Sequence, residues 1–204
     1  MGLWLHCFAL GKTCVMNVFP KSCTKWIQLF ILTASVQVAT VAADQTAEEL
    51  PGLFAQLLAE NDSDTSASIE GQIWQHWLNA PDSNSASLLS QINGALRASR
   101  LEIALQLSNQ LVDSSPDFSE AWNKRATIHY LMGNFPASVA DIRETVRLEP
   151  RHFGAISGLG MIFVQENNLP AALQAFEQVL KISPSSINAK RSIERVLRKM
   201  EREI

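Results

Sequence analysis

The chain has 204 residues, of which 17 are Lys or Arg and 20 are Asp or Glu, giving a formal net charge of −3 at pH 7. This acidic balance argues against nucleic acid as a general partner. The cysteines all lie near the start (Cys7, Cys14 and Cys23), which excludes a disulfide framework, a thiol nucleophile and a zinc–thiolate site from the rest of the chain.

Residues 1–43 have the pattern of a secretory signal peptide. Their only charged side chains are three lysines, Lys12, Lys21 and Lys25. An uncharged, largely apolar run over 26–43 ends in Val41-Ala-Ala43, which predicts cleavage before Asp44. Met16 is a possible true start, because it gives a signal of ordinary length. The alternative is an uncleaved membrane anchor through the same run, which is at the short limit for a spanning helix.

Residues 44–84 predict a pair of helices. Apolar side chains recur at helical spacing over 50–60 and again over 69–78, and a polar connector separates the two segments. The pair has the size of the helix pairs expected further along the chain. We therefore interpret it as an N-terminal helical cap or a diverged repeat, with Trp74 and Trp77 as core residues.

Three prolines then recur at a fixed spacing of 34 residues, namely Pro116, Pro150 and Pro184. Thirty-four residues is the period of a helix–turn–helix repeat. Within one period, Gly133 and Asn134 indicate a helix end, because Gly adopts the left-handed conformation that such an end favours, and Pro136 suits the start of the next helix. No stretch alternates long enough to predict a strand, so the sequence predicts an all-α fold.

The residues between the prolines follow one recurring pattern. Residues 153–186 have it most clearly, at Leu159, Gly160, Phe163, Ala172, Phe176 and Pro184. Residues 119–152 keep Trp122, a small Ala126 and Pro150, whereas residues 85–118 form a degenerate copy. This pattern resembles the tetratricopeptide repeat family, and in particular small secreted members from Gram-negative bacteria. The resemblance implies an α–α superhelix, a solenoid of about three repeats that ends in a C-terminal capping helix over 187–204.

The small residues of the pattern have a packing role. Gly160 and Ala172 are expected where the two helices of one repeat cross closely. A leucine in place of Gly160 should therefore cost about 1–3 kcal/mol by overpacking.

The expected capping helix carries many basic side chains: Lys190, Arg191, Arg195, Arg198, Lys199 and Arg202. The favoured interpretation is a solvated face that also complements the negative end of the helix dipole. The alternative is a docking patch for acidic lipid head groups or an acidic partner.

Candidates for chemistry are few beyond the first 43 residues. His76, His129 and His152 lack the spacing of metal ligands. We expect His129 to be packed or at a rim, and His152 to lie at the surface of a loop between repeats. The sequence predicts no catalytic residue, no cofactor and no metal. The alternative is an enzyme, or an accessory subunit of an envelope enzyme, with an unrecognised site near His76.

The resemblance also implies where a partner would bind, because the first helix of each repeat lines a concave groove in this family. The corresponding residues are Asn93, Arg97, Glu120, Asn123, Lys124, Thr127, Tyr130, Ser157, Met161 and Gln165. Some members grip a peptide's C-terminal carboxylate with cations at such positions. Here Gly154 and Gly158 replace them, so that specificity is not predicted. We expect instead a polar, nearly neutral groove for an extended or helical peptide.

These features together favour a protein–protein interaction module, an adaptor or assembly factor of the bacterial cell envelope. Its expected location is the periplasm, with other proteins as partners, no nucleic acid, and membrane contact only through the signal. The alternative location is the inner membrane, anchored through residues 26–43.

Overall fold

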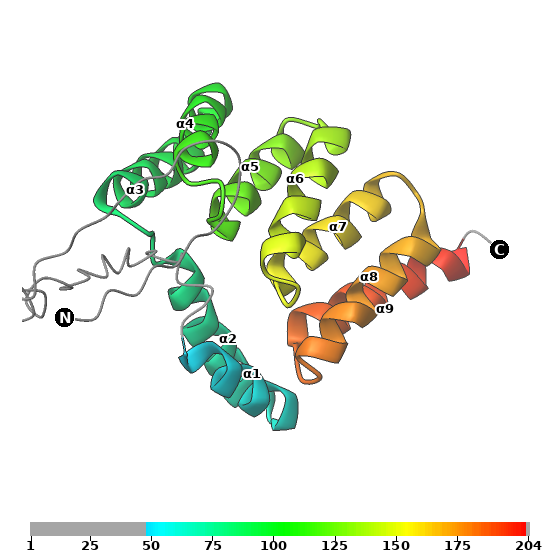
Figure 1. The fold of residues 1–204 in the computed structure, drawn as a ribbon. Helices are drawn as coiled ribbons and strands as arrows, with labels where there is room; N and C mark the ends of the chain where they lie inside the picture. Colours follow the sequence, from blue (N-terminus) through cyan, green and yellow to red (C-terminus); the bar gives the residue numbers. More distant parts are fainter. Residues whose placement is uncertain (1–47, 203–204) are drawn as a thin grey trace, which may run out of the picture. The chain divides into compact units, whose positions relative to one another are not determined.

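The computed structural model describes residues 48–202, which form helices and no strands, as the sequence predicts (Figure 1). The helices are α1 (Glu49–Ala59), α2 (Ser63–Leu78), α3 (Ser83–Arg97), α4 (Leu101–Ser114), α5 (Ser119–Leu131), α6 (Phe135–Leu148), α7 (Phe153–Gln165), α8 (Leu169–Ile182) and α9 (Ile187–Arg202). The signal segment over 1–43 lies outside the described residues. No helix within 48–202 has the length and apolarity needed to cross a bilayer.

Helices α3 to α9 form the repeat array. The pairs α3/α4, α5/α6 and α7/α8 follow one another, and α9 packs on α8 (Figure 1). Each junction buries its own apolar cluster: Ile92, Leu111 and Phe118 at the first, Ala126, Ile142 and Ile162 at the second, and Ala172, Phe176 and Val196 at the third. The first helix of each pair forms an inner layer, in which α5 contacts α7 directly.

The turns inside the pairs repeat the same backbone geometry. Ser99, Gly133 and Asn167 stand 34 residues apart, and all have a positive φ, at 55°, 75° and 57°. In the second and third pairs the next residue is an asparagine that caps the following helix, as Asn134 does by accepting a hydrogen bond from the Ala137 N–H at 3.4 Å. In the first pair Arg100 occupies this place and makes no side-chain cap. The degenerate copy therefore keeps the repeat's geometry with less suitable residues.

The helices of the third pair cross closely, as the sequence predicts. A Cβ added at Gly160 would lie 2.7 Å from Cε1 of Phe176 on α8. Ala172, on the same helix as Phe176, has no exposed surface. A larger side chain at either position would force α7 and α8 apart.

The pair α1/α2 lies in a different place from the one expected. An N-terminal cap or a further repeat would stack on α3. Instead the apolar side of the pair packs against the inner ends of α7, α8 and α9, in a cluster of Leu50, Leu53, Phe54, Leu57, Ile69, Ile73, Trp77, Phe153, Ile156, Val179 and Ala189. The pair therefore contacts helices of the second and third repeats and the capping helix.

Hydrogen bonds fix the pair to the loop between α8 and α9. The Ser183 hydroxyl donates to Oε1 of Glu70 at 2.7 Å, and the Ser185 hydroxyl donates to the carbonyl of Glu60 at 2.9 Å. Helix α2 also begins at Ser63, earlier than the predicted 69, because the Asp62 carboxylate accepts from the Thr65 N–H at 2.8 Å. The first turn of α2 is polar. The spacing of apolar residues that predicted the rest of this helix therefore did not extend to its first turn.

Candidate binding groove

The predicted groove residues fall into two groups along the inner layer. The first turns of α5 and α7, with Glu120, Asn123 and Phe153, lie against the α1/α2 pair, and we call this region the closed half. The last turns of the same helices, with Tyr130, Met161 and Gln165, face α9, and we call this region the open half. The sequence alone predicts one continuous groove, and the structure divides it.

The closed half contains a buried ionic cluster. Glu120 has no exposed surface, its Oε1 lies 3.2 Å from Nζ of Lys124, and its Oε2 accepts from Nδ2 of Asn123 at 2.8 Å and lies 3.3 Å from Nε2 of His152. Burial raises the pKa of the Glu120 carboxyl, but the hydrogen bond with His152 and the charge of Lys124 outweigh burial. The pKa therefore lies below its ordinary value of 4.5. Glu120 and Asn123 are thus buried here by contacts that stabilise the fold, whereas the Lys124 side chain remains 20% exposed.

His152 lies at the centre of this cluster, and its prediction as a surface residue is wrong. The side chain is fully buried, and Nδ1 accepts the Ala155 N–H at 3.1 Å, which caps α7. Because Nδ1 is an acceptor, the ring proton is on Nε2 and points to Glu120. Trp77 stacks on the imidazole at 4.1 Å between centroids and 10° between planes. The position of His152 in a loop after Pro150 did not indicate that α2 would cover its side chain.

The neighbouring tryptophan also packs against the inner layer. A Cβ added at Gly154 would lie 2.6 Å from the ring of Trp74, so the glycine is what allows α2 to approach α7. Trp77 is fully buried and Trp74 partly so. Both tryptophans are therefore core residues, as predicted.

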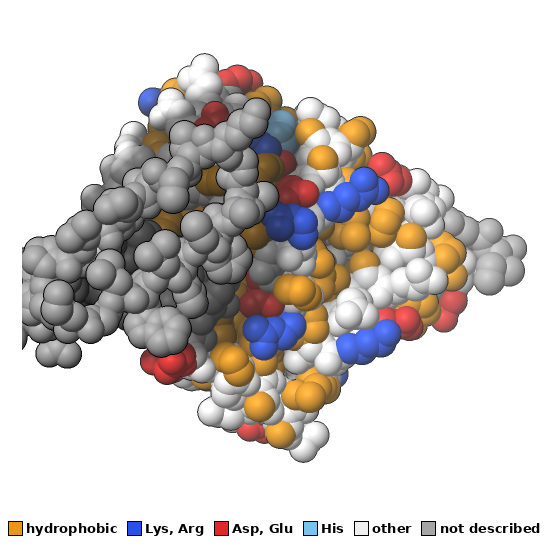
Figure 2. Space-filling model, viewed as in Figure 1, with side chains coloured by type: hydrophobic (Ala, Val, Ile, Leu, Met, Phe, Trp, Pro, Cys, Tyr) orange, Lys and Arg blue, Asp and Glu red, His pale blue; other side chains and the backbone are white. Residues whose placement is uncertain are grey.

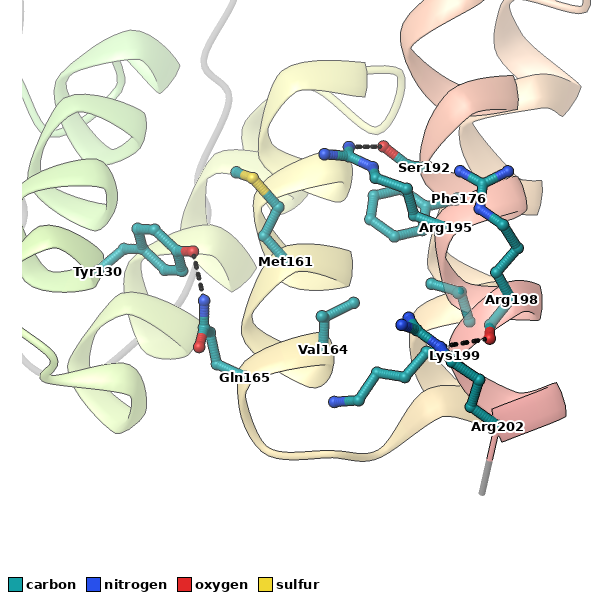
Figure 3. Close-up of a pocket in the computed structure, with 11 residues that line it drawn as sticks. Tyr130, Met161, Val164, Gln165, Phe176, Ser192, Arg195, Arg198, Lys199 and Arg202 are labelled. Atoms are coloured by element: carbon teal, nitrogen blue, oxygen red, sulfur yellow. Dashed lines mark hydrogen bonds between the residues drawn. The ribbon is translucent and has the colours of Figure 1, made fainter. Parts of the chain in front are cut away.

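The open half contains a cavity of about 380 Å³ between α7 and α9. Its floor is apolar, with Met161, Val164 and Phe176, and Met161 remains 44% exposed. The Tyr130 hydroxyl accepts a hydrogen bond from Gln165 at 3.4 Å at one end. Figure 3 shows Gln165 directed from α7 toward Tyr130, and Val164 lying between α7 and the basic side chains of α9.

Basic residues of α9 form the opposite wall, and the expectation of a nearly neutral groove is therefore wrong in this half. They are Arg195, Arg198, Lys199 and Arg202 (Figure 3). An adjoining cavity of about 510 Å³ adds Ser157, Arg191 and Glu194 to the same surface. The cations come from the capping helix, for which the sequence favours a solvated basic face and leaves a docking patch for acidic lipid head groups or an acidic partner as the alternative. A signal was present, because the basic residues are spaced by three and four residues beside the apolar Val196.

Residues of both halves also meet in a third, smaller cavity, whereas the predicted residues on α3 lie apart. Asn123, Thr127, Tyr130 and Met161 line a small cavity of about 70 Å³ between α5 and α7. Asn93 is partly exposed and Arg97 exposed on α3, and neither lines these cavities. The structure therefore brings together Tyr130, Ser157, Met161 and Gln165 and leaves the α3 residues apart.

His129 lies at a rim, as expected, with Nε2 3.8 Å from the Asp141 carboxylate that Arg125 also binds at 2.8 Å. Burial lowers the pKa of His129 below 6.5, and Asp141 acts in the opposite direction. Within residues 48–202, no three His, Cys, Asp or Glu side chains gather closely enough to hold a metal ion. The groove thus offers shape, apolar contact and positive charge.

Apolar surface is also exposed outside the cavity. Figure 2 shows a face on which hydrophobic side chains form a band, with separate Lys and Arg side chains standing among them. Exposed large apolar residues near the ends of the inner helices include Leu131 at 52% and Met132 at 39%. Such surface is typical of proteins that bind other proteins.

Comparison with known proteins agrees with this geometry. Residues 129–187 match the tetratricopeptide repeat family. A TPR repeat-containing protein of Rhizobium etli is 32% identical over 196 residues, which are 91% of this chain and 96% of that protein. The fold also resembles two solved domains, each with a TM-score of 0.54. The first TPR domain of Spaghetti (RPAP3), bound to the HSP90 peptide SRMEEVD, is 18% identical over 58% of this chain and 94% of that one. The TPR2B domain of yeast Sti1, in its complex with pHsp70, is 14% identical over 60% of this chain and 100% of that one. The chain belongs to the tetratricopeptide repeat family.

Proposed function

We propose that this protein is a protein–protein interaction module whose open half holds a peptide segment of another protein. The observation that carries the proposal is the cavity of about 380 Å³ between α7 and α9, on whose floor Met161 is 44% exposed. An apolar floor with a polar rim between helices is a common form of peptide site. The related repeat domain of RPAP3 holds a peptide and that of Sti1 is in a complex with pHsp70, which supports the same use of the fold here.

The proposed role is binding without catalysis, with no cofactor, no nucleic acid and no metal. Two of the buried ionisable residues, Glu120 and His152, are engaged in fixing α7 beneath α2. His76, the alternative catalytic centre considered from the sequence, lies 4.0 Å from Glu49 on the outer side of the α1/α2 pair, beside shallow surface depressions. These surroundings support the interpretation of His76 as a surface side chain.

We place the module in the bacterial cell envelope, as a periplasmic adaptor or assembly factor. The support is the signal pattern over residues 1–43, with inner-membrane anchoring through 26–43 as the alternative. Mass spectrometry of the protein purified from its own host distinguishes the two. We expect a mature chain that begins at Asp44, whereas recovery of peptides spanning 26–43 from the purified protein contradicts cleavage.

Photo-cross-linking tests the binding role. A photoreactive amino acid replaces Met161 in the open half or, as a control, the exposed Gln174 on the outer helix α8. We expect irradiation of intact cells to give discrete protein adducts with the Met161 probe and few with the Gln174 probe. Equal adducts from both positions, or none from either, would refute the placement of the site.

A further inference from the structure

We infer that the open half is selective for an acidic peptide segment, in which carboxylates flank an apolar side chain. This inference rests on the proposed protein-binding function and names the chemistry of its partner. It concerns the groove between α7 and the capping helix α9, which differs from the repeat positions where the sequence led us to look for cations.

The first argument is the concentration of positive charge. Helix α9 has six Lys or Arg and two Glu among its 16 residues, in a chain whose net charge is −3. Arg195, Arg198 and Lys199 are three of the residues that line the cavity beside α7. Because these cations line one cavity, a ligand in that cavity meets several of them at once.

The second argument is that little charge within the described chain neutralises them. Between residues 48 and 202, only Arg198 of the four cations in the main cavity pairs with a carboxylate, that of Glu194 at 3.5 Å. Arg195 donates to the neutral Ser192 hydroxyl at 2.9 Å, and Arg202 donates to the Arg198 carbonyl at 3.1 Å. These hydrogen bonds orient the guanidinium groups without bringing a carboxylate from residues 48–202 to them, so the groove complements carboxylates on a partner.

The third argument is the apolar floor. Met161, Val164 and Phe176 give the cavity an apolar part beside the basic side chains of α9, and its volume can hold an apolar side chain (Figure 3). A bound anion alone would leave this floor exposed to water. A peptide with an apolar residue between acidic ones satisfies both parts of the site, since its side chain covers Met161 while its carboxylates reach α9.

The concave shape favours a peptide over a membrane surface. The cavity of about 380 Å³ and its neighbour of about 510 Å³ form a surface sunk between helices, which a single peptide segment fills more completely than a broad layer of head groups. An acidic protein segment can enter and follow the groove.

Selection from a random peptide library displayed on phage tests the inference directly. We expect peptides selected on the wild-type protein to be enriched in Asp and Glu around an apolar residue. The charge-reversed variant Arg195→Glu with Arg198→Glu should lose that enrichment. The matched control is Lys181→Glu with Lys190→Glu, which changes the charge equally at exposed positions outside both cavities and should select the same acidic peptides as the wild type.

Affinity measurements then quantify the effect with the selected consensus peptide, labelled with fluorescein. We expect the charge-reversed variant to bind it on the order of tenfold more weakly, since each exposed ion pair contributes modestly. We also expect weaker binding at high salt and loss of binding when Gln and Asn replace the acidic residues of the peptide. Circular dichroism confirms that both variants remain folded.

Three outcomes overturn the inference. If the selected peptides are not enriched in acidic residues, the groove does not select its ligand by charge. Equal affinities for the two double variants show that α9 does not supply the contact. Binding to phosphatidylglycerol vesicles that the Arg195→Glu, Arg198→Glu variant abolishes, without binding of any acidic peptide, assigns the patch to a lipid surface. In each case, specific adducts from the Met161 photoprobe would still support the proposed protein-binding function, so the two failures are distinguishable.

Discussion

The closed half and the open half of the inner layer are built by the same two helices, α5 and α7, yet they differ in what lies against them. In the closed half, α2 buries Ile73 and Trp77 completely. In the open half, Met161 stays 44% exposed beside a basic wall. The repeat pattern alone therefore does not indicate which part of an inner layer is available to a partner.

The chemistry of the two halves explains this division. Full burial of a large apolar side chain contributes about 1.5–3 kcal/mol, and the α1/α2 pair also buries Leu50 and Leu57 without exposed surface. The pair is thus a permanent part of the core. In the open half the α9 side chains are long and charged, so they line the cavity without filling it.

The largest effect is expected from Trp77→Ala. It removes the ring that stacks on His152 and should lower the free energy of unfolding by about 3–5 kcal/mol, as measured by urea denaturation. Trp77→Phe should cost much less, because the indole N–H finds no hydrogen-bond acceptor among the described residues. Met161→Ala in the open half is the matched control and should change stability by no more than about 0.5 kcal/mol. Similar losses at Trp77 and Met161 would contradict the division into two halves.

Two glycines one turn apart on α7 sharpen the comparison. Gly154→Ala places a Cβ 2.6 Å from the Trp74 ring and should destabilise the protein by about 1–3 kcal/mol. At Gly158 the nearest side-chain atom, Cδ1 of Ile142, would be 3.7 Å away, an ordinary contact. Gly158→Ala should therefore stabilise by about 0.5–1 kcal/mol, because glycine is unfavourable inside a helix. Thermal melts of the two variants should move in opposite directions, and a shift of the same sign would place α2 elsewhere.

The buried Glu120 predicts a pH dependence for the closed half. Its folded pKa lies below the ordinary value of 4.5, so at intermediate pH the folded state holds fewer protons than the unfolded state. The stabilisation is therefore complete above pH 4.5 and is lost as the pH falls through the folded pKa. Glu120→Gln should cost about 1–3 kcal/mol at neutral pH, and the difference from the wild type should shrink under acid.

Comparison with the variant isolates Glu120 from other acid-sensitive groups. The helix-capping carboxylates Asp62 and Asp82 also have lowered pKa values, mainly through hydrogen bonds from the Thr65 and Ser85 backbones. These contributions are present in the wild type and in Glu120→Gln, so they cancel in the difference between the two unfolding free energies. Urea denaturation over a series of pH values measures this difference. If the difference stays constant under acid, Glu120 is not the titrating group.

Local patterns predicted most of the array, because each one has a local physical cause. The spacing of Pro116, Pro150 and Pro184 gave the repeats, and Gly133 and Asn134 gave a turn that the structure confirms with a φ of 75° and an asparagine cap. The close crossing at Gly160 was predicted for the same reason, since only a small residue leaves room for Phe176.

The errors concern contacts between residues far apart in the chain. Ser66 faces Ser183, and Trp77 covers His152. The residues of each pair are far apart in the sequence, and no periodicity of the sequence predicts such contacts. Two other residues, Glu120 and Asn123, sit at the expected register on α5 but are buried. The basic residues of the capping helix were identified in the sequence, but their place beside the groove was not, because the family's groove positions lie on the repeats and Arg195 and Arg198 do not.

A change outside both halves should give a small effect and leave the comparison intact. Ser99 has a φ of 55°, at the place where the second repeat has Gly133. A non-glycine residue in this conformation is strained, so Ser99→Gly should stabilise the protein by about 0.5–1 kcal/mol. Denaturation measures the gain, and peptide affinity at the open half should not change. Because Ser99 is remote from the α1/α2 pair, its effect should add to that of Gly154→Ala within about 0.5 kcal/mol. Clear non-additivity would mean that the turn at Ser99 and the contact between Gly154 and Trp74 are coupled.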